Sequence, residues 1–517
     1  MKKFLPLLLA LCLLLSSTAV GEVLGEYPVT TEPITLTAWG ILPTSATNTF
    51  NENTALLEME KITGVHIEYE SVTSNGSSEK RALMLSGDLP DIIFRGALSD
   101  TQLSELAISG QIIPLDDLVE EYAPNLCALF NRIENLETCM RAEDGHIYAL
   151  GQVNPISITA HYVINQKWLD KLQLAVPTTL DEFYNVLTAF KQQDANNDGN
   201  ADNEIPFSVS GLNNLYPLMS AFDIFPAASN GMYVYPGESE VKFAFIQDGY
   251  KAAMKYFAKL YKEGLLDAEF LAQDGSTLKT KGTANTVGVL RVNGAFQQVG
   301  NELHFDYQGM APLEDSQGNR YTIAQTPSAG NQFVITANCK YPEAAIRWAD
   351  YFYSQEGTNL AWMGVENVTW HWIDENTWDW MTPEGISTSE WRHNNAIQGG
   401  TGYPAAHPSL FPSDMWSKQN NAIECSLDTE QFRLPNTRCG VSVFPPVKIS
   451  AETRETISFV MTDVNAYVQT MTADFITGLT DIDAAWDEYV QTIKDMGIDS
   501  MIELYQGIYD NYQASQK

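Results

Sequence analysis

An amide-rich, acidic loop near the middle of the chain has the spacing of a calcium site. Side-chain oxygens recur along it at Asp194, Asn196, Asp198, Asn200, Asp202 and Glu204. Gly199 stands at the sixth position, where an EF-hand-like loop turns sharply, and Asn200 at the seventh would supply its backbone carbonyl. Calcium is a hard cation that prefers oxygen ligands, so the spacing predicts a structural Ca²⁺ site. The twelfth position is Ile205 rather than glutamate, which leaves the last ligand open, with Glu204 as the candidate. The alternative is a solvated turn after a helix.

Tryptophans gather in one stretch of the chain. Six of the eleven lie close together, at Trp362, Trp370, Trp372, Trp378, Trp380 and Trp391. An indole ring offers a flat apolar face and an N–H donor, a combination that suits stacking on a sugar. We expect Trp370 and Trp372 to line a ligand site, because alternate residues of an extended segment share a face. The alternative is that these rings pack in a core.

The elements that would position a site begin at residue 34. Apolar and polar residues alternate over 34–39 and 65–69, helical spacing separates these two runs, and a compact apolar run at 91–94 follows a short second helix. This order predicts a parallel α/β unit. Ligands bind beyond the carboxyl ends of parallel strands, so Trp39 and Arg95 are candidate ligand residues. Arg291 and Asn293 are further polar candidates.

Composition and charge narrow the class of protein. The chain has 517 residues, 30 Lys+Arg and 65 Asp+Glu, and a formal net charge of −35. Such an acidic surface repels polyanions and argues against a nucleic-acid partner. At roughly 100–200 residues per domain, the length is sufficient for two to four domains or for two large interleaved lobes.

The N-terminus indicates export. Two lysines precede a twelve-residue apolar run at 4–15, and small residues follow it, as in a cleaved secretory signal. Cys12 lies inside the apolar run rather than at a cleavage point, so we expect a secreted form without a lipid anchor. Five cysteines would remain, an odd number. The pairs Cys127/Cys139 and Cys425/Cys439 are either local disulfides or small buried side chains.

Several segments in order carry a family resemblance. They are Glu60–Val65, Leu83–Ile93, Ile113–Leu118, Ala123–Asn125, Pro177–Phe183 and Phe475–Gly478. The chain resembles the extracellular solute-binding proteins of ABC importers, family 1, in the branch that includes the alginate-binding proteins. The resemblance runs from about residue 35 to about residue 512. It implies an α/β fold of two lobes, with the ligand in a cleft between them.

The resemblance also implies how the chain is divided. The expected parts are a signal peptide at 1–21, a tether at 22–33, a first lobe of 34–157 plus 328–365, and a second lobe of 158–327 plus 366–517. Crossings between lobes are expected near 155–160, 325–330 and 365. The expected partners are an oligosaccharide and an ABC permease, and the protein is expected to be a monomer.

Enzymatic readings have little support in the sequence. It contains no Gly-x-Ser-x-Gly elbow, no His-Glu-x-x-His and no Walker A loop. Two alternatives to a solute receptor stay open. One is a secreted, calcium-stabilised glycosidase, since 65 acidic residues offer many carboxylate pairs. The other is a two-lobe surface sensor or adhesin, because a fold does not fix a function.

Overall fold

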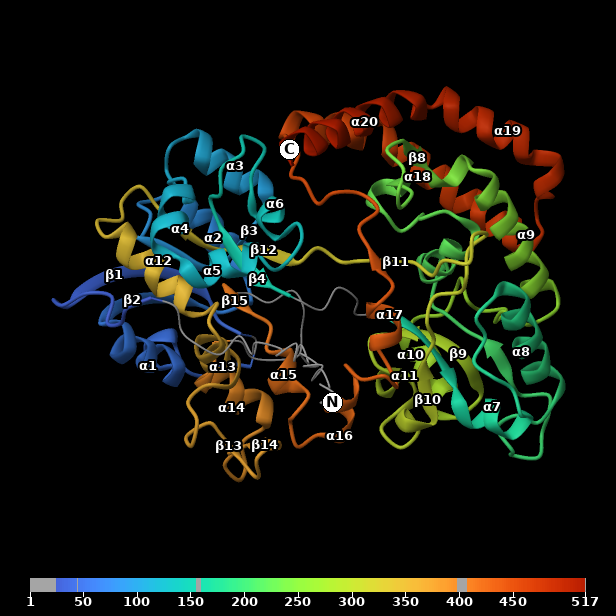
Figure 1. Ribbon diagram of the computed structural model, residues 1–517, viewed down its shortest axis with the longest axis horizontal. Helices are drawn as coiled ribbons and strands as arrows, with labels where there is room; N and C mark the ends of the chain where they lie inside the picture. The colour runs from blue at the N-terminus through green and yellow to red at the C-terminus, as the bar shows by residue number, and fades with distance from the viewer. Residues whose placement is uncertain (1–24, 44, 155–159, 398–406, 517) are drawn as a thin grey trace, which may run out of the picture.

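The computed structural model describes residues 25–43, 45–154, 160–397 and 407–516. The chain forms two lobes that lie side by side, and segments of the chain run between them (Figure 1). The proposed signal peptide at 1–21 and the crossing expected near 155–160, apart from Ala160, lie outside the described residues. Among the helices that are described, none is both long enough and apolar enough to cross a membrane.

The first lobe is built on a six-stranded sheet in the order β15-β4-β12-β3-β1-β2. Its strands are β1 (Ile34–Ile41), β2 (Val65–Val72), β3 (Ile92–Leu98), β4 (Leu150–Val153), β12 (Ser328–Ile335) and β15 (Ser409–Leu410). Its helices are α1 (Thr54–Thr63), α2 (Ser77–Leu85), α3 (Asp100–Ile108), α4 (Asp116–Tyr122), α5 (Pro124–Phe130), α6 (Leu136–Met140), α12 (Pro342–Tyr351), α13 (Gln355–Met363), α14 (Thr388–Asn395) and α15 (Ser413–Trp416). The hairpin β13 (Trp370–Trp372) and β14 (Trp378–Trp380) extends from it.

The expected parallel α/β unit is confirmed at the start of this lobe. Strand β1 pairs in parallel with both β2 and β3, and helices α1 and α2 connect them. Asn53 caps α1 by accepting from the N–H groups of Ala55 and Leu56, and Gly64 ends it in the left-handed region at φ 73°. Strand β3 is buried on both faces, since Phe94 packs into one core and Ile93 into the other.

The second lobe contains a four-stranded sheet in the order β10-β5-β9-β6. Its strands are β5 (His161–Asn165), β6 (Ile205–Phe207), β9 (Val287–Val292) and β10 (Tyr307–Gly309), with β7 (Met232–Val234) paired to β8 (Val241–Phe243) and β11 (Thr322–Ile323) paired to β16 (Gly440–Val441). Its helices are α7 (Gln166–Leu172), α8 (Leu180–Gln192), α9 (Asp248–Lys262), α10 (Gly275–Thr283), α11 (Phe296–Val299), α16 (Ala422–Ser426), α17 (Leu434–Thr437), α18 (Ala451–Thr477), α19 (Ile482–Asp495) and α20 (Ile498–Ser515). A large aromatic core joins α8 and α9 to the three C-terminal helices.

The third expected crossing, near residue 365, is wrong, and so is the placement of 366–416 in the second lobe. Strand β15 pairs with β4 in the first sheet, and Trp370, Trp378 and Trp416 belong to the first core. The chain leaves this lobe after Asn420, whose N–H donates to the carbonyl of Trp378. Burial of these indoles in the first core holds the segment on this lobe.

The expected tether is also partly wrong. Within 22–33, Val29 is buried, and its N–H donates to Thr63 O at 2.7 Å. The ring of Tyr27 packs edge-on against Tyr351 at 5.2 Å between centroids. These contacts fasten the segment to α1 and α12, because an apolar residue and an aromatic ring interrupt its polar composition.

The disulfide alternative is not found in the described residues. All five described cysteines are free thiols and are partly buried. Burial raises the pKa of Cys139 to about 12 and that of Cys339 to about 11, so these two are protonated at neutral pH.

Candidate ligand and calcium sites

Arg291, one of the predicted ligand residues, lines a cavity. It lies on β9 opposite Tyr162 of β5, and it faces a pocket of about 180 Å³ in the second lobe. The pocket lies next to the ends of two crossings, because Ala160 and Gln325 contribute to its wall. Its other lining residues are Tyr216, Pro217, Ser220, Ile224, Phe225, Ala227, Thr322 and Ile323. We call it the Arg291 pocket.

The guanidinium of Arg291 is held in place by neutral groups. Its Nη1 donates to Asn214 Oδ1 at 2.9 Å and its Nη2 to the carbonyl of Ala160 at 3.5 Å. Asn214 is itself fixed, since its amide donates to Ser210 O and its carbonyl accepts from the Tyr162 hydroxyl. Within the part of the chain that the structure describes, the buried Nε of Arg291 has no partner. A buried donor without a partner favours a ligand that accepts hydrogen bonds.

The other predicted ligand residues do not line this pocket. Trp39 lies inside β1, only 1% exposed, and packs in a first-lobe core. Asn293 is exposed, and its carbonyl accepts from Arg433. Arg95 is buried on β3, where its Nε donates to Ile41 O at 2.8 Å and its Nη1 to Ile397 O at 3.0 Å. Burial lowers the pKa of Arg95 to about 10.

The tryptophan cluster is a packed element of the first lobe. Trp370 is 3% exposed, and its Nε1 donates to Gly364 O at 3.2 Å. Its ring contacts Trp372 and Trp378 edge-on, at 5.7 and 5.8 Å between centroids. The stacking face that we expected for sugar binding is therefore covered in Trp370. Trp372 is half-buried, with the Lys418 ammonium 5.9 Å from its ring centre.

A buried arginine completes this cluster. The Arg392 guanidinium lies between the rings of Trp380 and Trp416, 4.9 and 5.0 Å from their centres. Burial lowers its pKa to about 10, whereas nearby Glu424 has its pKa raised by burial. Cation–π contact with two indoles stabilises this buried charge, which no local pattern in the sequence predicts.

Sequence reasoning missed the aromatic and polar wall of the Arg291 pocket. Tyr216 and Phe225 come from the turn-rich stretch between β6 and β7, whereas Thr322 and Gln325 lie about 100 residues later. Nothing in their spacing marks them, because only folding brings these segments to Arg291. The adjacent residues Tyr216 and Pro217 are the single local signal of a rigid aromatic turn.

The loop 193–204 connects α8 to β6, which is an edge strand of the second lobe's four-stranded sheet. Its side chains hydrogen-bond its own backbone: Asp198 N–H donates to Asp194 Oδ1 and Asn196 Oδ1, both at 3.0 Å. Asn200 N–H donates to Asp198 Oδ1 at 2.8 Å. Gly199 has φ 90°, the left-handed geometry that the sharp turn requires. Hydrogen bonds, led by that from Asn203, lower the pKa of Asp198.

Glu204 differs from the other candidate calcium ligands of the loop because it is buried. Its carboxylate is 2% exposed and points into the loop, where Oε1 accepts from Asn196 N–H at 3.4 Å. Oε2 has no partner among the described residues. Among the described residues of the chain, no three His, Cys, Asp or Glu side chains lie close enough together to hold a metal ion as they stand. The all-oxygen donor set and the orphaned carboxylate oxygen fit a calcium ion, with Glu204 as a ligand in place of residue 205.

Proteins of known function resemble this chain over nearly its whole length. The chain is 28% identical over 485 residues to the fructooligosaccharide ABC transporter substrate-binding protein FusA of Streptococcus pneumoniae, covering 90% of this chain and 88% of FusA. The structure of FusA in complex with kestose superposes with a TM-score of 0.66, covering 93% of this chain and 100% of that one. The polygalacturonan/rhamnogalacturonan-binding protein YtcQ of Bacillus subtilis is 30% identical over 219 residues, 42% of each protein.

A more distant structure shows the same fold. An HMO-binding, ABC-transporter-associated solute-binding protein of Bifidobacterium longum infantis has a TM-score of 0.74 at 20% identity. It covers 93% of this chain and 99% of its own. The family model for bacterial extracellular solute-binding proteins matches residues 44–359. With two lobes joined by crossing segments and a polar pocket beside those crossings, this chain belongs to the bacterial extracellular solute-binding proteins.

Proposed function

We propose that the protein is the extracytoplasmic receptor of an ABC importer and that its ligand is an oligosaccharide. The observation that carries this proposal is the likeness to FusA over 485 residues, which spans both lobes and the crossings between them. The sequence of the N-terminus supports export, and the family supports a permease as partner. We propose a secreted monomer.

The Arg291 pocket is the proposed anchoring point for one end of that ligand. Pockets that enclose a whole drug-sized ligand measure roughly 300–1,000 Å³. A pocket of about 180 Å³ would therefore hold part of an oligosaccharide and leave the remainder between the lobes. The Arg291 guanidinium, which lines the pocket, has donors left for a sugar oxygen, and Tyr216 and Phe225 supply aromatic surface beside it.

The chemistry of this pocket favours binding over hydrolysis. Glycoside hydrolysis generally needs a pair of carboxyl groups on either side of the scissile bond. None of the residues described as lining the Arg291 pocket is an aspartate or a glutamate. We therefore propose no glycosidase activity, against the alternative that the acidic composition left open.

Calcium has a structural part in this proposal. A structure of FusA with a mutated EF-hand, bound to fructo-nystose, is 26% identical to this chain over 93% of its length, with a TM-score of 0.65. In this chain Asp194, Asn196, Asp198, Asp202 and Glu204 would hold the ion by their side chains, and Asn200 by its carbonyl. Bound calcium would neutralise the buried Glu204 charge and fix the link between α8 and β6.

The test is a thermal-shift screen against kestose, larger fructooligosaccharides, uronate oligosaccharides and milk oligosaccharides. A ligand at 100 times its dissociation constant stabilises the folded protein by about 2.7 kcal/mol. Arg291→Met should lower the affinity for the stabilising glycan at least tenfold. Arg438→Met is the matched control, because Arg438 is exposed and paired with Glu430.

Two results would reject the proposal. If no oligosaccharide shifts the melting temperature, the ligand class is wrong. If a bound glycan is cleaved on prolonged incubation, as seen by chromatography of the products, the protein is a glycosidase.

A further inference from the structure

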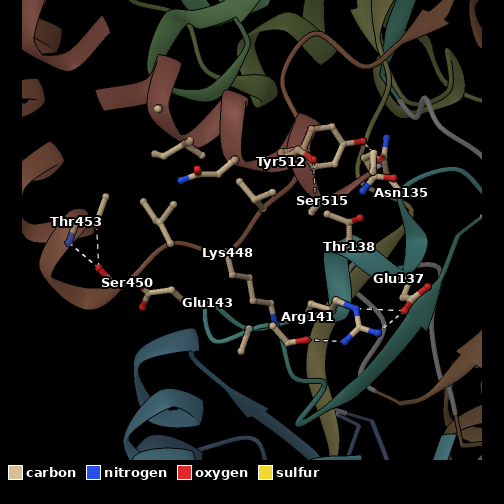
Figure 2. A pocket seen from close by; sticks show the side chains of 18 of the residues that line it. Asn135, Glu137, Thr138, Arg141, Glu143, Lys448, Ser450, Thr453, Tyr512 and Ser515 are labelled. Carbon is tan, nitrogen blue, oxygen red and sulfur yellow. Dashed lines mark hydrogen bonds and ion pairs between the residues drawn. The ribbon is translucent and has the colours of Figure 1, made fainter. Parts of the chain in front are cut away.

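A buried ion pair of the second lobe lies outside both candidate sites. Lys281 Nζ of α10 lies 2.7 Å from Asp267 Oδ2, and the two side chains are 17% and 7% exposed. Neither is among the described residues that line the Arg291 pocket or the larger hollow of about 1020 Å³ shown in Figure 2. Taking two charges out of water is costly. The position of this pair therefore points to a role within the fold rather than in direct contact with a ligand.

The carboxylate of Asp267 gathers several donors besides Lys281. Its Oδ2 accepts from Ser208 Oγ at 2.6 Å and from Gln273 Nε2 at 3.1 Å, and its Oδ1 accepts from Glu269 N–H at 3.1 Å. Lys281 Nζ also donates to Gln273 Oε1 at 2.9 Å. Side chains that share one buried carboxylate hold one another in a single arrangement.

This arrangement fastens the segment that follows β6. Three hydrogen bonds join the backbone of 207–211 to the segment 267–273. They are Asp267 N–H to Phe207 O at 2.8 Å, Gln273 Nε2 to Val209 O at 2.7 Å, and Gly211 N–H to Phe270 O at 2.7 Å. Strand β6 has already ended at residue 207, so these bonds and the Ser208 hydroxyl set the path of the chain beyond it.

The fastened segment leads directly to the partner of Arg291. The Asn214 amide donates to Ser210 O at 2.6 Å, and Asn214 Oδ1 accepts from Arg291 Nη1 at 2.9 Å. The strand that carries Arg291 is reached as well, since Ser208 N–H donates to Val289 O at 3.0 Å, two residues before it on β9. Both backbone segments that determine the place of the guanidinium are therefore tied to the buried carboxylate.

We propose that Asp267 is a positioning residue for the Arg291 pocket. Together with Lys281 and Gln273 it fixes the turn 208–214, and Asn214 in that turn holds the Arg291 guanidinium at the pocket wall. A side chain that is held before the ligand arrives loses less conformational freedom on binding, which raises affinity. The effect on ligand affinity rests on the proposed function, whereas the effect on the turn does not.

The first experiment needs no ligand. Amide hydrogen exchange of the full chain is compared between the parent protein and Asp267→Asn. We expect faster exchange in peptides that cover 208–216, because the hydrogen bonds of this turn open more often once its anchor is weakened. Asp306→Asn is the matched control, since it removes a second-lobe ion pair, to Lys167 at 2.6 Å, and should leave these peptides unchanged. Equal exchange of 208–216 in the parent and in Asp267→Asn overturns the proposal.

The second experiment asks whether Asp267 acts through Arg291. Affinity for kestose is measured by titration calorimetry in the parent, Asp267→Asn, Arg291→Met and the double variant. We expect Asp267→Asn to lower the affinity of the parent about threefold to tenfold. In Arg291→Met it should lower the affinity no further, because the side chain that it positions is gone. A residue that only supports the fold would lower the affinity by the same factor in both backgrounds.

A milder variant keeps the test decisive if Asp267→Asn does not melt cooperatively. Ser208→Ala removes one hydrogen bond to the carboxylate, and it should give the same pattern with a smaller loss. No loss of affinity in a folded variant overturns the proposal, and so does an equal loss with and without Arg291. Failure of the parent itself to bind kestose counts against the proposed ligand, and hydrogen exchange then decides whether Asp267 positions the turn.

Discussion

The tryptophan segment of the first lobe and the Arg291 pocket of the second lobe make a useful contrast. The first is conspicuous in the sequence and is packed: Trp370 is covered by its neighbours and Trp378 is fully buried. The second is inconspicuous in the sequence, yet it places the Arg291 guanidinium beside aromatic rings in the wall of a pocket. Residue type states what a side chain can do, whereas its neighbours decide whether a ligand can reach it.

The largest expected effect tests whether Trp370 is a core residue. Trp370→Ala should lower the free energy of unfolding by about 3–5 kcal/mol, the range for removing a large buried side chain, as measured by the urea midpoint. Trp372→Ala should cost less, because Trp372 is half-buried. If Trp370→Ala left the urea midpoint unchanged and greatly lowered the glycan affinity, Trp370 would be a ligand residue and not a core residue.

A pH effect of similar size concerns a buried histidine of the second lobe. His304 is fully buried and stacks on Phe432, with its Nδ1 accepting from Phe296 N–H and its Nε2 donating to Ser426. Burial lowers the pKa of His304 from 6.5 to about 4. Between these values the unfolded chain binds a proton that the folded protein does not. Stability should therefore fall by about 3 kcal/mol as the pH drops from 6.5 to 4.

The measurement is urea unfolding at a series of pH values. Other groups also titrate in this range. The prediction therefore concerns the free energy of unfolding plotted against pH, which should fall more steeply in the parent than in His304→Gln. His66→Gln is the control, because His66 is exposed on β2. If parent and His304→Gln lose stability in parallel, ionisation of His304 does not control this loss.

A smaller effect concerns the calcium loop. The difference in stability between Glu204→Gln and the parent should change sign when calcium is added. Glu204→Gln removes a buried charge whose Oε2 has no partner among the described residues, so the metal-free protein should be as stable as the parent or more stable by about 1–2 kcal/mol. In calcium, the parent should gain melting temperature and the variant should gain much less. Calorimetry with chelator and with calcium measures both.

The control for the loop is Asp487→Asn, an exposed change on α19. It should leave the increment from calcium unchanged. A parent protein whose melting temperature is the same in chelator and in calcium would show that the loop is a solvated turn.

The smallest expected effect separates charge from shape at Arg291. Arg291→Lys keeps the positive charge but loses the planar fork that reaches Asn214 and Ala160 together. We expect a loss of about tenfold in glycan affinity, equivalent to about 1.4 kcal/mol, with an unchanged urea midpoint. Titration calorimetry on the stabilising glycan measures it. Full affinity in Arg291→Lys would mean that charge alone matters and that the fixed geometry does not.

Local pattern was sufficient for the elements of the first lobe. Alternation over 34–39 and helical spacing before Gly64 correctly predicted β1, α1, β2 and the parallel pairing that joins β1 to β3. These signals are local, because strand alternation and helix caps act within a few residues. The calcium-loop prediction, which has still to be tested, rests on the same kind of local spacing.

The tertiary structure decided where the lobes divide and which side chains face a pocket. From the sequence alone, the parallel α/β start and the family could be predicted, and both are confirmed. The export signal and the calcium loop are also predicted by the sequence, and they stay predictions. The sequence could not place 366–416 on the first lobe, because burial of Trp370 and Trp378 depends on partners far away in the chain. Likewise, Arg291, Tyr216 and Gln325 meet only after the chain has folded, since long-range packing rather than local spacing sets their distance.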